Sequence, residues 1–596
     1  GAASSRVQDA KTADLDFNAV QRGDAEMENK MNRVIRACIE LGDRNPIVSI
    51  HDQGAGGNGN VLKEIAEPAG AELFLRRLPI GDDTMTALEL WGAEYQENCA
   101  LLIQPEHRDL FERICKRENM YFAFLGNVTG DGLVKVHDEK DGSMPVDLHL
   151  DDVLGKMPQK TFTSDAVQKV LKPLDLDISP ESFTPALDRV LRLLQVGSKR
   201  FLTSKVDRSV TGLVAQQQCV GPLHTPLADV GVIAQSCFPN ADGVYTGVAT
   251  AIGEQPIKGL VCEKAMARLT VAEALTNLVF AKVTALEDVK CSANWMWAAK
   301  LAGEGAAMYD ACEAMCAVMN EVGISVDGGK DSLSMAAKAG DEVVKCPGQL
   351  AISVYAMCPD VTLTLTPDLK PLGSPSEISS LVYVPISGMG SAAPRLGGSA
   401  LAQVFNQLGD TSPDLDEPAL LVKAFNATQD LIQSRKLVAG HDVSDGGLIT
   451  AMLEMAFAGN VGFRAELDSA LCKDNGVLAL FAEEVGLVLQ VAPGQDAAVT
   501  DAFKNAGVSC FVLGTVTADQ QLSLKVGETD LFATQPSMTH WRDVWEATSF
   551  ELDKLQSNPA SVEAEQKGMP ERKSPPYSLT FVPTETVPES AAAQTR

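Results

Sequence analysis

The spacing of apolar residues along the chain predicts helices and strands in alternation. Charged and apolar residues alternate at helical spacing over residues 27–41, which predicts an amphipathic helix. The apolar run at 46–50 predicts a buried strand that carries His51 and Asp52 at its end. A glycine-rich turn follows, and a helix is expected from about Asn60. A strand, a glycine turn and a helix N-terminus in this order suit the binding of anions.

The middle of the chain shows a second set of α/β patterns. Apolar runs bounded by turn residues predict strands at 213–215, 230–234 and 349–357. Longer segments with helical spacing predict helices at 263–281 and 305–322.

One pattern occurs twice. The heptad HDQGAGG at 51–57 recurs 390 positions later as HDVSDGG at 441–447. Each copy is followed by an apolar run and then by a Leu-Gly pair, which begins 73 residues after Asp52 and 71 residues after Asp442. Because a chance match would not keep this spacing, the chain contains a duplicated domain of roughly 150 residues.

The repeat defines the domain organisation. We call the two copies B (18–156) and B′ (369–535), and the different domain between them A′ (197–368). If an A–B unit was duplicated, one A domain is missing from the start, so we expect the chain to be a fragment. The remaining segments are expected to be a flexible segment at 1–17, a proline-rich linker ending in a short helix at 157–196, a helical extension at 536–558 and a flexible proline-rich stretch at 559–596.

Composition and charge exclude several classes of protein. A chain of 596 residues with 45% apolar and 22% charged residues is typical of a globular protein of several domains. The net charge of −29 argues against binding to duplex nucleic acid or a membrane surface, although Mg²⁺ and backbone N–H groups would still allow ATP to bind. The 13 cysteines form no C-x-x-C pair, and the sequence has neither a signal peptide nor an apolar run of membrane-spanning length. These features predict a reduced, cytoplasmic protein.

Asp52 and Asp442 each end a predicted strand beside a pair of glycines. A carboxylate at the C-terminal end of a strand, facing a glycine turn, is where α/β folds usually hold Mg²⁺ and phosphate. The alternative is a hydrogen-bonded turn or a helix N-cap without any ligand. Since the arrangement occurs twice at matching depth, we favour a metal site at both.

Three residues of A′ are also candidate oxygen ligands. Glu273 and Asn277 lie four residues apart on the predicted helix 263–281, on the face that is expected to pack inward. They suit a hard cation, and the alternative is a capping or buried hydrogen-bonded pair. Asp229 precedes the apolar strand at 230–234, and taken alone such a residue is more commonly exposed at a strand edge.

Two other segments have the composition of ligand contacts. The segment VDGGKDSLS (326–334) predicts a glycine-rich loop like a phosphate cradle, with Lys330 as a point charge. It lacks the spacing of a Walker A motif, and a plain β-turn is the alternative. The segment GAEYQE (92–97) combines an acid, a phenol and an amide, which suits a polyhydroxyl or amide ligand; otherwise it is a solvated helix end. His51 and His441 have no Ser or Cys nearby, so nothing supports nucleophilic catalysis.

A family resemblance rests on seven motifs together. They are HDQGAGG, AEYQEN (93–98), TPLADV (225–230), RLTVAEALTN (268–277), CSANWM (291–296), GGKDSLSM (328–335) and GHDVSDGGL (440–448). The set resembles the synthetase part of large-type phosphoribosylformylglycinamidine synthases, and the resemblance covers nearly all of 15–556. It implies an α/β (α+β) fold of duplicated aminoimidazole-ribonucleotide-synthetase-like domains in the order B–A′–B′, whose two halves pack as a pseudo-dimer.

The resemblance also implies a reaction and its ligands. In this family ATP phosphorylates the amide oxygen of formylglycinamide ribonucleotide, and glutamine-derived ammonia then displaces phosphate to give the amidine. The implied cofactors are ATP or ADP and Mg²⁺, with the metal neutralising the transferring phosphoryl group. By matching motif, the implied substrate contacts are Gln21, Glu94, Tyr95, Gln96 and Ser332. The implied nucleotide contacts are Ala228, Ser444, Gly329 and Lys330, and the implied metal ligands are Asp229, Glu273, Asn277, Asp442 and Asp52.

Those residues divide between two nucleotide sites. The set formed by Ala228, Ser444, Asp229, Glu273, Asn277 and Asp442 resembles a second-half site that is thought to hold a nucleotide without turnover. Asp52, Gly329 and Lys330 would lie at the active nucleotide. Tyr95 stands where many relatives have Ser, and Lys330 where small-type relatives have Asn.

Two parts of the family pattern are not found in this sequence. One is the first synthetase domain, with its catalytic His and glycine-rich ATP loop, and the other is the C-terminal glutaminase domain, toward which 559–596 would lead. The expected partners are therefore formylglycinamide ribonucleotide, ammonia from a glutaminase domain and the missing first domain. No catalytic residue is assigned, and we expect the chain to be incomplete for turnover. The alternatives are a nucleotide-binding scaffold without turnover and a sibling kinase of the same superfamily, although the duplicated B domain argues against the sibling.

Overall fold

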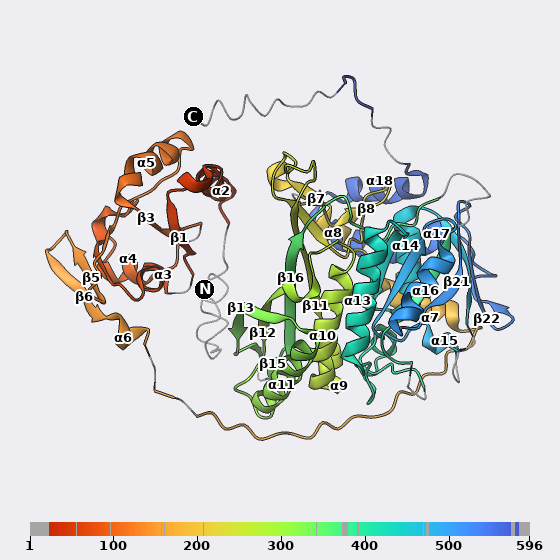
Figure 1. The fold of residues 1–596 in the computed structure, drawn as a ribbon. Coiled ribbons are helices and arrows are strands. Elements are labelled where there is room, and N and C mark those ends of the chain that lie inside the picture. The colour runs from red at the N-terminus through yellow and green to blue at the C-terminus, as the bar shows by residue number, and fades with distance from the viewer. Residues whose placement is uncertain are drawn as a thin grey trace. The chain divides into compact units, whose positions relative to one another are not determined.

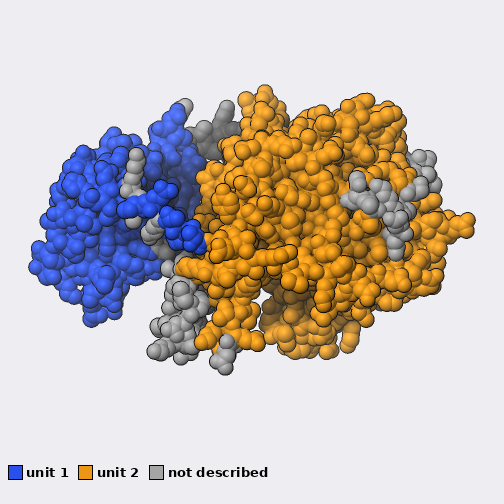
Figure 2. Space-filling model, turned by 90° about the horizontal axis from the view of Figure 1, so that it is seen from below, with its two compact units in different colours: residues 1–163, 579–596 blue, residues 164–578 orange. Residues whose placement is uncertain are grey.

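The computed structural model describes residues 23–582 except 55, 96, 156–157, 160, 207, 341, 372–378, 390–392, 469, 472–475 and 574–577. The expected flexible segment 1–17 lies outside this part of the chain. The chain divides into unit 1 (residues 1–163 and 579–596) and unit 2 (164–578), each of which is considered by itself (Figure 2). None of the described helices has the length and apolar character needed to cross a membrane.

Unit 1 contains domain B as two small sheets, each with its own hydrophobic core (Figure 1). In the first, β1 (Ile47–Asp52) pairs antiparallel with β3 (Cys99–Ile103) and packs against α2 (Ala25–Ile39) and α5 (Arg108–Arg117). The second sheet has the strand order β4-β2-β5-β6 and packs against α3 and α4. Its elements are β2 (Ala71–Phe74), β4 (Gly126–Val128), β5 (Leu133–Asp138), β6 (Ser143–His149), α3 (Gly57–Ala66), α4 (Ala87–Gly92) and α6 (Leu150–Val153).

The expected strand at 46–50 forms, but the expectation that it is buried is wrong. Val48 and Ile50 of β1 are 60% and 42% exposed. The corresponding strand of B′, β18 (Leu437–Val443), is almost fully buried, and Gly440 lies directly under the ring of Phe280 from A′. Among the described residues of unit 1 no such cover lies on β1.

In unit 2, domain A′ is a six-stranded sheet with the order β13-β12-β16-β11-β10-β7. Alternate residues of β11 (Gly247–Glu254) and β16 (Gln349–Cys358) are buried, and helices α10 (Glu263–Leu278) and α11 (Glu304–Val322) pack on that face. Helix α10 buries apolar residues all round, which is the behaviour expected of a central helix. The predicted helices and strands of A′ are therefore confirmed to within a few residues. The other elements are α8 (Arg200–Thr203), β7 (Val214–Gln216), the antiparallel pair β8 (Cys219–Val220) and β9 (Thr225–Pro226), β10 (Gly231–Ala234), α9 (Pro256–Val261), β12 (Lys290–Met296), β13 (Ser325–Ser332), and the hairpin β14 (Ala336–Ala339) with β15 (Glu342–Lys345).

Domain B′ is a seven-stranded sheet with the order β18-β20-β17-β21-β19-β22-β23. Its helix α13 (Pro418–Gln433) lies beside α10 and α11 (Figure 1), and A′ and B′ share one hydrophobic core there. The other elements are β17 (Ser380–Pro385), α12 (Ala400–Val404), α14 (Gly447–Gly459), β19 (Gly462–Leu467), α15 (Gly476–Ala479), β20 (Gly486–Val491), α16 (Asp496–Ala506), β21 (Phe511–Thr517), β22 (Leu522–Val526) and β23 (Thr529–Asp530).

The two copies of the repeat differ at one strand. In B′, β17 pairs with both β20 and β21 and joins them into one sheet. The corresponding strands of B are β3 and β4, because each pair carries the same repeated motifs. Among the described residues of unit 1 no strand lies between β3 and β4, so the B sheet is in two parts.

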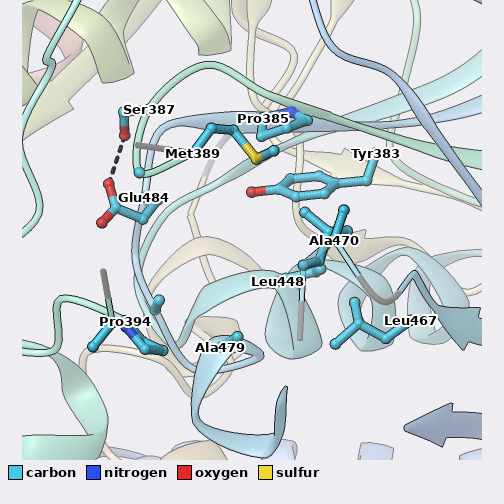
Figure 3. A pocket seen from close by; sticks show the side chains of 14 residues that line it. Tyr383, Pro385, Ser387, Met389, Pro394, Leu448, Leu467, Ala470, Ala479 and Glu484 are labelled. Carbon is cyan, nitrogen blue, oxygen red and sulfur yellow. Dashed lines mark hydrogen bonds between the residues drawn. The ribbon is translucent and has the colours of Figure 1, made fainter. Parts of the chain in front are cut away.

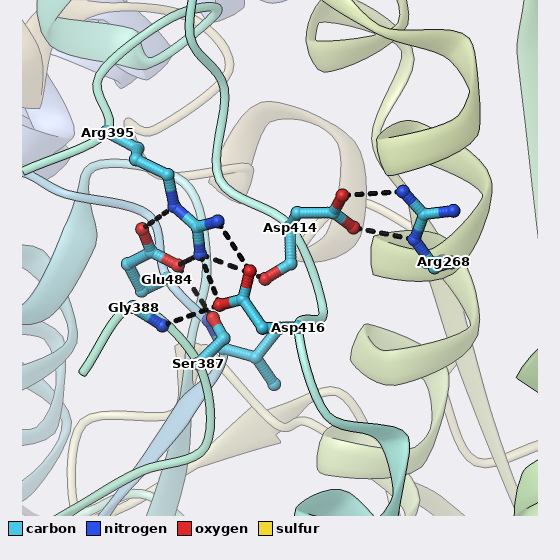
Figure 4. A network of polar contacts seen from close by, with 8 residues as sticks. Arg268, Ser387, Gly388, Arg395, Asp414, Asp416 and Glu484 are labelled. Atoms are coloured by element: carbon cyan, nitrogen blue, oxygen red, sulfur yellow. Dashed lines mark hydrogen bonds and ion pairs between the residues drawn. The ribbon is translucent and has the colours of Figure 1, made fainter. Parts of the chain in front are cut away.

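A network of ion pairs also joins A′ to B′ (Figure 4). Arg268 on α10 forms two bonds of 2.8 and 2.5 Å with Asp414 of B′. Arg395 contacts the carbonyl of Asp414 and binds the carboxylates of Asp416 and Glu484 at 2.6–2.9 Å. These bonds tie the helix that carries Glu273 and Asn277 to the loops of B′.

The C-terminal extension forms helices that pack on unit 2. The expected helical extension is α17 (Met538–Gln556), whose Trp541 and Trp545 are buried in the B′ core. Residues expected to be flexible from 559 onward instead begin with α18 (Pro559–Gly568). The polar composition misled the prediction, since one buried apolar residue and one ion pair suffice: Val562 of α18 packs with Phe550 of α17 and Met569, and Glu565 of α18 pairs with Lys205 at 3.2 Å.

Candidate functional site

Five of the predicted site residues line one pocket of unit 2. The pocket has a volume of about 500 Å³, within the usual range for small-molecule sites. It lies between β10 and β11 of A′ and the end of β18 in B′. The predicted residues that line it are Ala228, Asp229, Asn277, Asp442 and Ser444.

The end of β18 positions Asp442 and Ser444. The strand stops at Val443, and Gly446 and Gly447 then adopt positive φ angles of 85° and 75°, which allows the chain to turn into helix α14. Gly56 and Gly57 do the same at 90° and 60° in domain B, so the repeated heptad folds alike in both copies. No side chain caps α14, and the N-cap is Gly446, so Asp442 is not the helix cap that was its alternative role.

Helix α10 positions Glu273 and Asn277 against strand β11. A Cβ at Gly253 would lie 2.2 Å from the Thr270 carbonyl oxygen, so only glycine permits this close approach of helix and strand. Glu273 then accepts the Glu254 backbone N–H at 2.6 Å, and Asn277 donates to the Ile252 carbonyl at 3.0 Å. One polar atom of each side chain is therefore bonded to the backbone of β11, and both residues are half-buried.

A compact acidic cluster forms where these elements meet. One ligand atom each from Asp229, His441 and Asp442 lie within 4.8 Å of one another. Asp229 is not the exposed strand-edge residue that was its alternative role, because its side chain is only 3% exposed. The Oδ2 atoms of Asp229 and Asp442 are buried and have no hydrogen-bond partner among the described residues. Two carboxylates of one cluster, each with a buried unpaired oxygen, fit a divalent cation of the Mg²⁺ type.

The electrostatics of the cluster agree with that fit. Burial, together with the neighbouring Asp229, raises the pKa of Asp442 to about 8. Burial and the nearby Asp442 and Asp445 hold the pKa of Glu273 well above its usual range. Burial disfavours the charged form of His441, but Asp229 and Glu454 outweigh it and hold its pKa well above the usual range. The protein alone therefore disfavours the charged forms of Asp442 and Glu273, which a bound cation would favour.

Sequence reasoning missed a second polar cluster beside the first. Lys258 of α9 is fully buried and binds Asp445 at 3.0 Å and also Glu483. Asp445 accepts the Gln195 amide at 2.6 Å, and Glu483 accepts the backbone N–H groups of Gly446 and Ala400, both at 2.8 Å. The pair Glu483-Glu484 within an apolar run was the available signal for this cluster. Adjacent acids in such a run are buried only where charged or hydrogen-bonding partners face them, so the pair indicates a buried polar cluster.

Sequence reasoning also set His441 aside, because no Ser or Cys lay nearby. The structure places its Nδ1 2.6 Å from Asp229 Oδ1 and its Nε2 3.2 Å from Glu454 Oε2. His441 is therefore the partner of a candidate metal ligand, and a search for nucleophile partners could not have found that role.

Asp52 occupies the equivalent position in unit 1 but in a different environment. Its side chain is 87% exposed, and His51 Nε2 lies 3.0 Å from Glu64. Nearby, the Tyr95 backbone N–H donates to Gln53 at 2.6 Å and its hydroxyl donates to the Glu89 carbonyl at 3.0 Å. Gln21 and Gln96 lie outside the described residues. Glu94 and Tyr95 belong to unit 1, whereas Ser332 belongs to unit 2.

The predicted phosphate loop at 326–334 is not a loop, and neither is it the plain turn that was its alternative. Residues 325–332 form β13, which pairs in parallel with β12. Gly329 is required there because a Cβ would lie 2.0 Å from the Ala293 carbonyl oxygen. Lys330 points along the strand to Ser332, with Nζ 3.1 Å from its hydroxyl. The loop was expected because close strand packing and a phosphate cradle select the same residue, glycine; a nucleotide contact of Gly329 and Lys330 stays a prediction.

A smaller pocket of about 80 Å³ lies in B′ (Figure 3). Tyr383, Leu448, Leu467 and Glu484 line it, and Glu484 accepts the Ser387 hydroxyl at 2.6 Å. Burial raises the pKa of Tyr383 above its usual range. None of the predicted site residues lines this pocket.

Comparison with known families matches three segments of the chain. The family described as "FGAR-AT PurM_N-like domain" matches residues 198–357. The family described as "AIR synthase related protein, C-terminal domain" matches residues 1–139 and 385–527. The second family therefore occurs twice, on either side of the first.

Curated relatives are similar over nearly the whole chain. Human phosphoribosylformylglycinamidine synthase is 53% identical over 607 residues, covering 99% of this chain and 44% of the relative. The probable chloroplastic/mitochondrial phosphoribosylformylglycinamidine synthase of Arabidopsis thaliana is 52% identical, covering 98% of this chain and 41% of the relative. The chain thus spans less than half the length of these relatives.

Solved structures share the fold at low sequence identity. PurLQS from Thermotoga maritima is 14% identical with a TM-score of 0.55, covering 85% of this chain and 69% of that one. Thermotoga maritima PurL complexed with ATP is 14% identical with a TM-score of 0.53, and the match covers 84% of this chain and 68% of that one. PurL complexed with FGAR is 13% identical with a TM-score of 0.50, and the match covers 84% of this chain and 66% of that one. The α/β class and the duplicated synthetase-like domains expected from the sequence are confirmed.

Proposed function

The chain belongs to the phosphoribosylformylglycinamidine synthase family, and we propose that it forms part of an ATP-dependent ligase of purine biosynthesis. The full-length enzyme would convert formylglycinamide ribonucleotide, ATP and glutamine-derived ammonia into the amidine. The names of the relatives support the ligase, and the PurL complexes with ATP and FGAR support its nucleotide and substrate.

Within this chain, the pocket between A′ and B′ would hold an adenine nucleotide with Mg²⁺. The observation that carries this proposal is the pair of buried, unpaired carboxylate oxygens on Asp229 and Asp442, in a pocket that Asn277 and Ser444 also line. Glu273 would complete the set of oxygen ligands, and Ala228 and Ser444 would contact the nucleotide. A bound Mg²⁺ would neutralise both the phosphates and this acidic cluster.

The reacting nucleotide and the substrate would bind at the predicted residues that do not belong to the A′–B′ pocket. Asp52 would be a metal ligand there, and its exposed side chain leaves its oxygens available. Gly329 and Lys330 would contact the nucleotide, the lysine through its charge on β13. The substrate contacts would be Gln21, Glu94, Tyr95, Gln96 and Ser332.

Nucleotide retention and calorimetry test the A′–B′ site. Purified, dialysed protein is denatured and the released adenine nucleotide is measured, and stripped protein is titrated with Mg·ADP and Mg·ATP. We expect binding by the wild type and much weaker binding by Asp442→Ala. Asp52→Ala, which removes the exposed counterpart in B, is the matched control and should leave this binding unchanged. No released nucleotide together with no calorimetric binding would show that the assignment is wrong.

The same two substitutions in the full-length protein test the division of roles. Phosphate release from ATP that depends on formylglycinamide ribonucleotide is measured with ammonium salt in place of glutamine. We expect Asp52→Ala to abolish it while leaving the retained nucleotide in place. If Asp442→Ala instead abolishes turnover without affecting retained nucleotide, the active and auxiliary sites are reversed.

A further inference from the structure

A series of polar contacts leads from helix α17 to the candidate metal ligands. The Trp545 indole N–H on α17 points to Glu454 Oε1 at 3.0 Å, and it also lies 3.0 Å from the Val196 carbonyl. Glu454 Oε2 lies 3.2 Å from His441 Nε2, and His441 Nδ1 lies 2.6 Å from Asp229 Oδ1. We call these four residues, Trp545, Glu454, His441 and Asp229, the carboxylate–imidazole chain.

The contacts leave the His441 ring little freedom. Both ring nitrogens face carboxylate oxygens from different elements, Glu454 on α14 and Asp229 before β10. The ring is buried, and Nδ1 is also 3.5 Å from Asp442 Oδ1. With Oδ1 of Asp229 held by His441, its Oδ2 is left without a hydrogen-bond partner among the described residues, as is Asp442 Oδ2. The carboxylate–imidazole chain thus determines which aspartate oxygens are available to a cation.

The repeat shows that the histidine–glutamate pair is part of the module. In domain B, His51 Nε2 lies 3.0 Å from Glu64 Oε2, and the two residues are 13 positions apart, as are His441 and Glu454. Each glutamate lies seven residues after the glycine that begins its helix, at two turns along the same face. The same contact has therefore formed in both copies, one buried and one exposed, so it does not depend on the surroundings of B′.

From this geometry we propose that Glu454, with Trp545 behind it, acts through His441 to position Asp229 relative to Asp442 and so controls the affinity of the site for a divalent cation. The inference rests on the proposed metal site and adds positioning residues that do not themselves touch the ion. Groups that orient metal ligands in this way commonly change metal affinity by roughly 10–100-fold. Because Trp545 belongs to α17, the cation site of A′–B′ also depends on the helical extension beyond B′.

The test measures the Mg²⁺ dependence of ADP binding in Glu454→Ala, Glu454→Gln and Trp545→Phe. We expect Glu454→Ala to raise the apparent Kd for Mg²⁺ by about 10–100-fold. Glu454→Gln keeps a polar group at both contacts and should recover most of the affinity. Trp545→Phe should lie between them. The control is Trp541→Phe on the same helix, which loses a similar bond to the Gln535 carbonyl but lies outside the carboxylate–imidazole chain, and should leave the Mg²⁺ affinity unchanged.

Thermal unfolding in EDTA separates positioning from general damage to the fold. A Mg²⁺ affinity unchanged by Glu454→Ala would overturn the proposal. So would an affinity loss equal in Glu454→Gln and Glu454→Ala, or one that only follows a lower melting temperature in EDTA. Wild-type protein that binds no Mg·ADP would instead overturn the proposed function. Mn²⁺ binding followed by electron paramagnetic resonance without nucleotide then tests the same variants, and the absence of that binding would overturn the inference as well.

Discussion

Lys258 offers the sharpest test of how A′ and B′ are held together. Its ammonium group is 1% exposed and contacts two carboxylates of B′, Asp445 at 3.0 Å and Glu483. Lys258→Met keeps an unbranched side chain, shorter by the terminal nitrogen, but removes the charge and the donors. A buried carboxylate, Glu483, and a half-buried one, Asp445, would then both lose this cation.

The expected loss in the free energy of unfolding depends on the hydrogen bonds that each carboxylate keeps. Glu483 would retain the N–H groups of Gly446 and Ala400, and Asp445 would retain the Gln195 amide. Removing one partner of a buried ion pair typically costs about 3–5 kcal/mol, and we expect the upper half of that range because two charges lose their partner. For a unit of roughly 400 residues that unfolds cooperatively, this corresponds to a melting temperature lower by about 4–6 °C.

Calorimetry and guanidinium unfolding of the wild type and Lys258→Met provide the measurement. The double substitution Lys258→Met with Glu483→Gln should recover part of the loss, because it removes one of the two unpaired charges. Lys169→Met is the control, since Lys169 pairs with Glu263 at a site about one-third exposed and should cost less than about 1 kcal/mol. A loss below about 1 kcal/mol for Lys258→Met, or an equal loss for Lys169→Met, would refute the reasoning.

Two further substitutions test unit 2 and unit 1 in turn. Gly329→Ala would place a Cβ 2.0 Å from the Ala293 carbonyl oxygen and should lower the free energy of chemical unfolding by about 1–3 kcal/mol. Its control is Gly328→Ala, which should be close to neutral because nothing lies within 4 Å of the added Cβ. Equal effects of the two substitutions would contradict the close strand contact. In unit 1, the hydrogen bonds from Arg76 lower the pKa of Asp138 to about 2 from an ordinary value of 3.8, so this carboxylate stabilises the fold above about pH 4 and loses that effect as the pH falls toward 2. Asp138→Asn should cost about 2 kcal/mol near neutrality and flatten the acid limb of the unfolding curve, whereas an unchanged acid limb would show that the Arg76 pair does not stabilise unit 1.

The pocket of A′ and B′ was largely predictable, because its residues belong to local patterns. Asp442 ends an apolar strand before two glycines, and Glu273 and Asn277 share a helix face, so their backbone positions follow from the sequence. That Asp229 joins them depends on how two domains meet. Only the family resemblance, and no spacing rule, linked it to Asp442 across more than two hundred residues.

The remainder could not be predicted for physical reasons that differ from case to case. Asp229, one partner of His441, comes from a strand entry 212 residues earlier, so no local pattern marks it. The other partner, Glu454, lies 13 residues after His441, and the same spacing from His51 to Glu64 is a signal that the repeat offered. The run GGKDS fits both a phosphate loop and a closely packed strand, and the Ala293 carbonyl decides between them. The burial of Val48 and Ile50 depends on what packs on β1, which the apolar pattern itself does not specify.

The divided sheet of domain B has a consequence for how the chain resists local opening. In B′ the strand β17 makes the sheet one hydrogen-bonded block, so its amides should be protected from hydrogen exchange as a single cooperative unit. In B the sheet of β1 and β3 and the sheet of β4, β2, β5 and β6 have separate cores. Two copies of one ancestral domain should therefore exchange in different ways within the same molecule. The amides of B should open in two independent groups, and those of β3 and β4 should exchange long before their counterparts on β20 and β21.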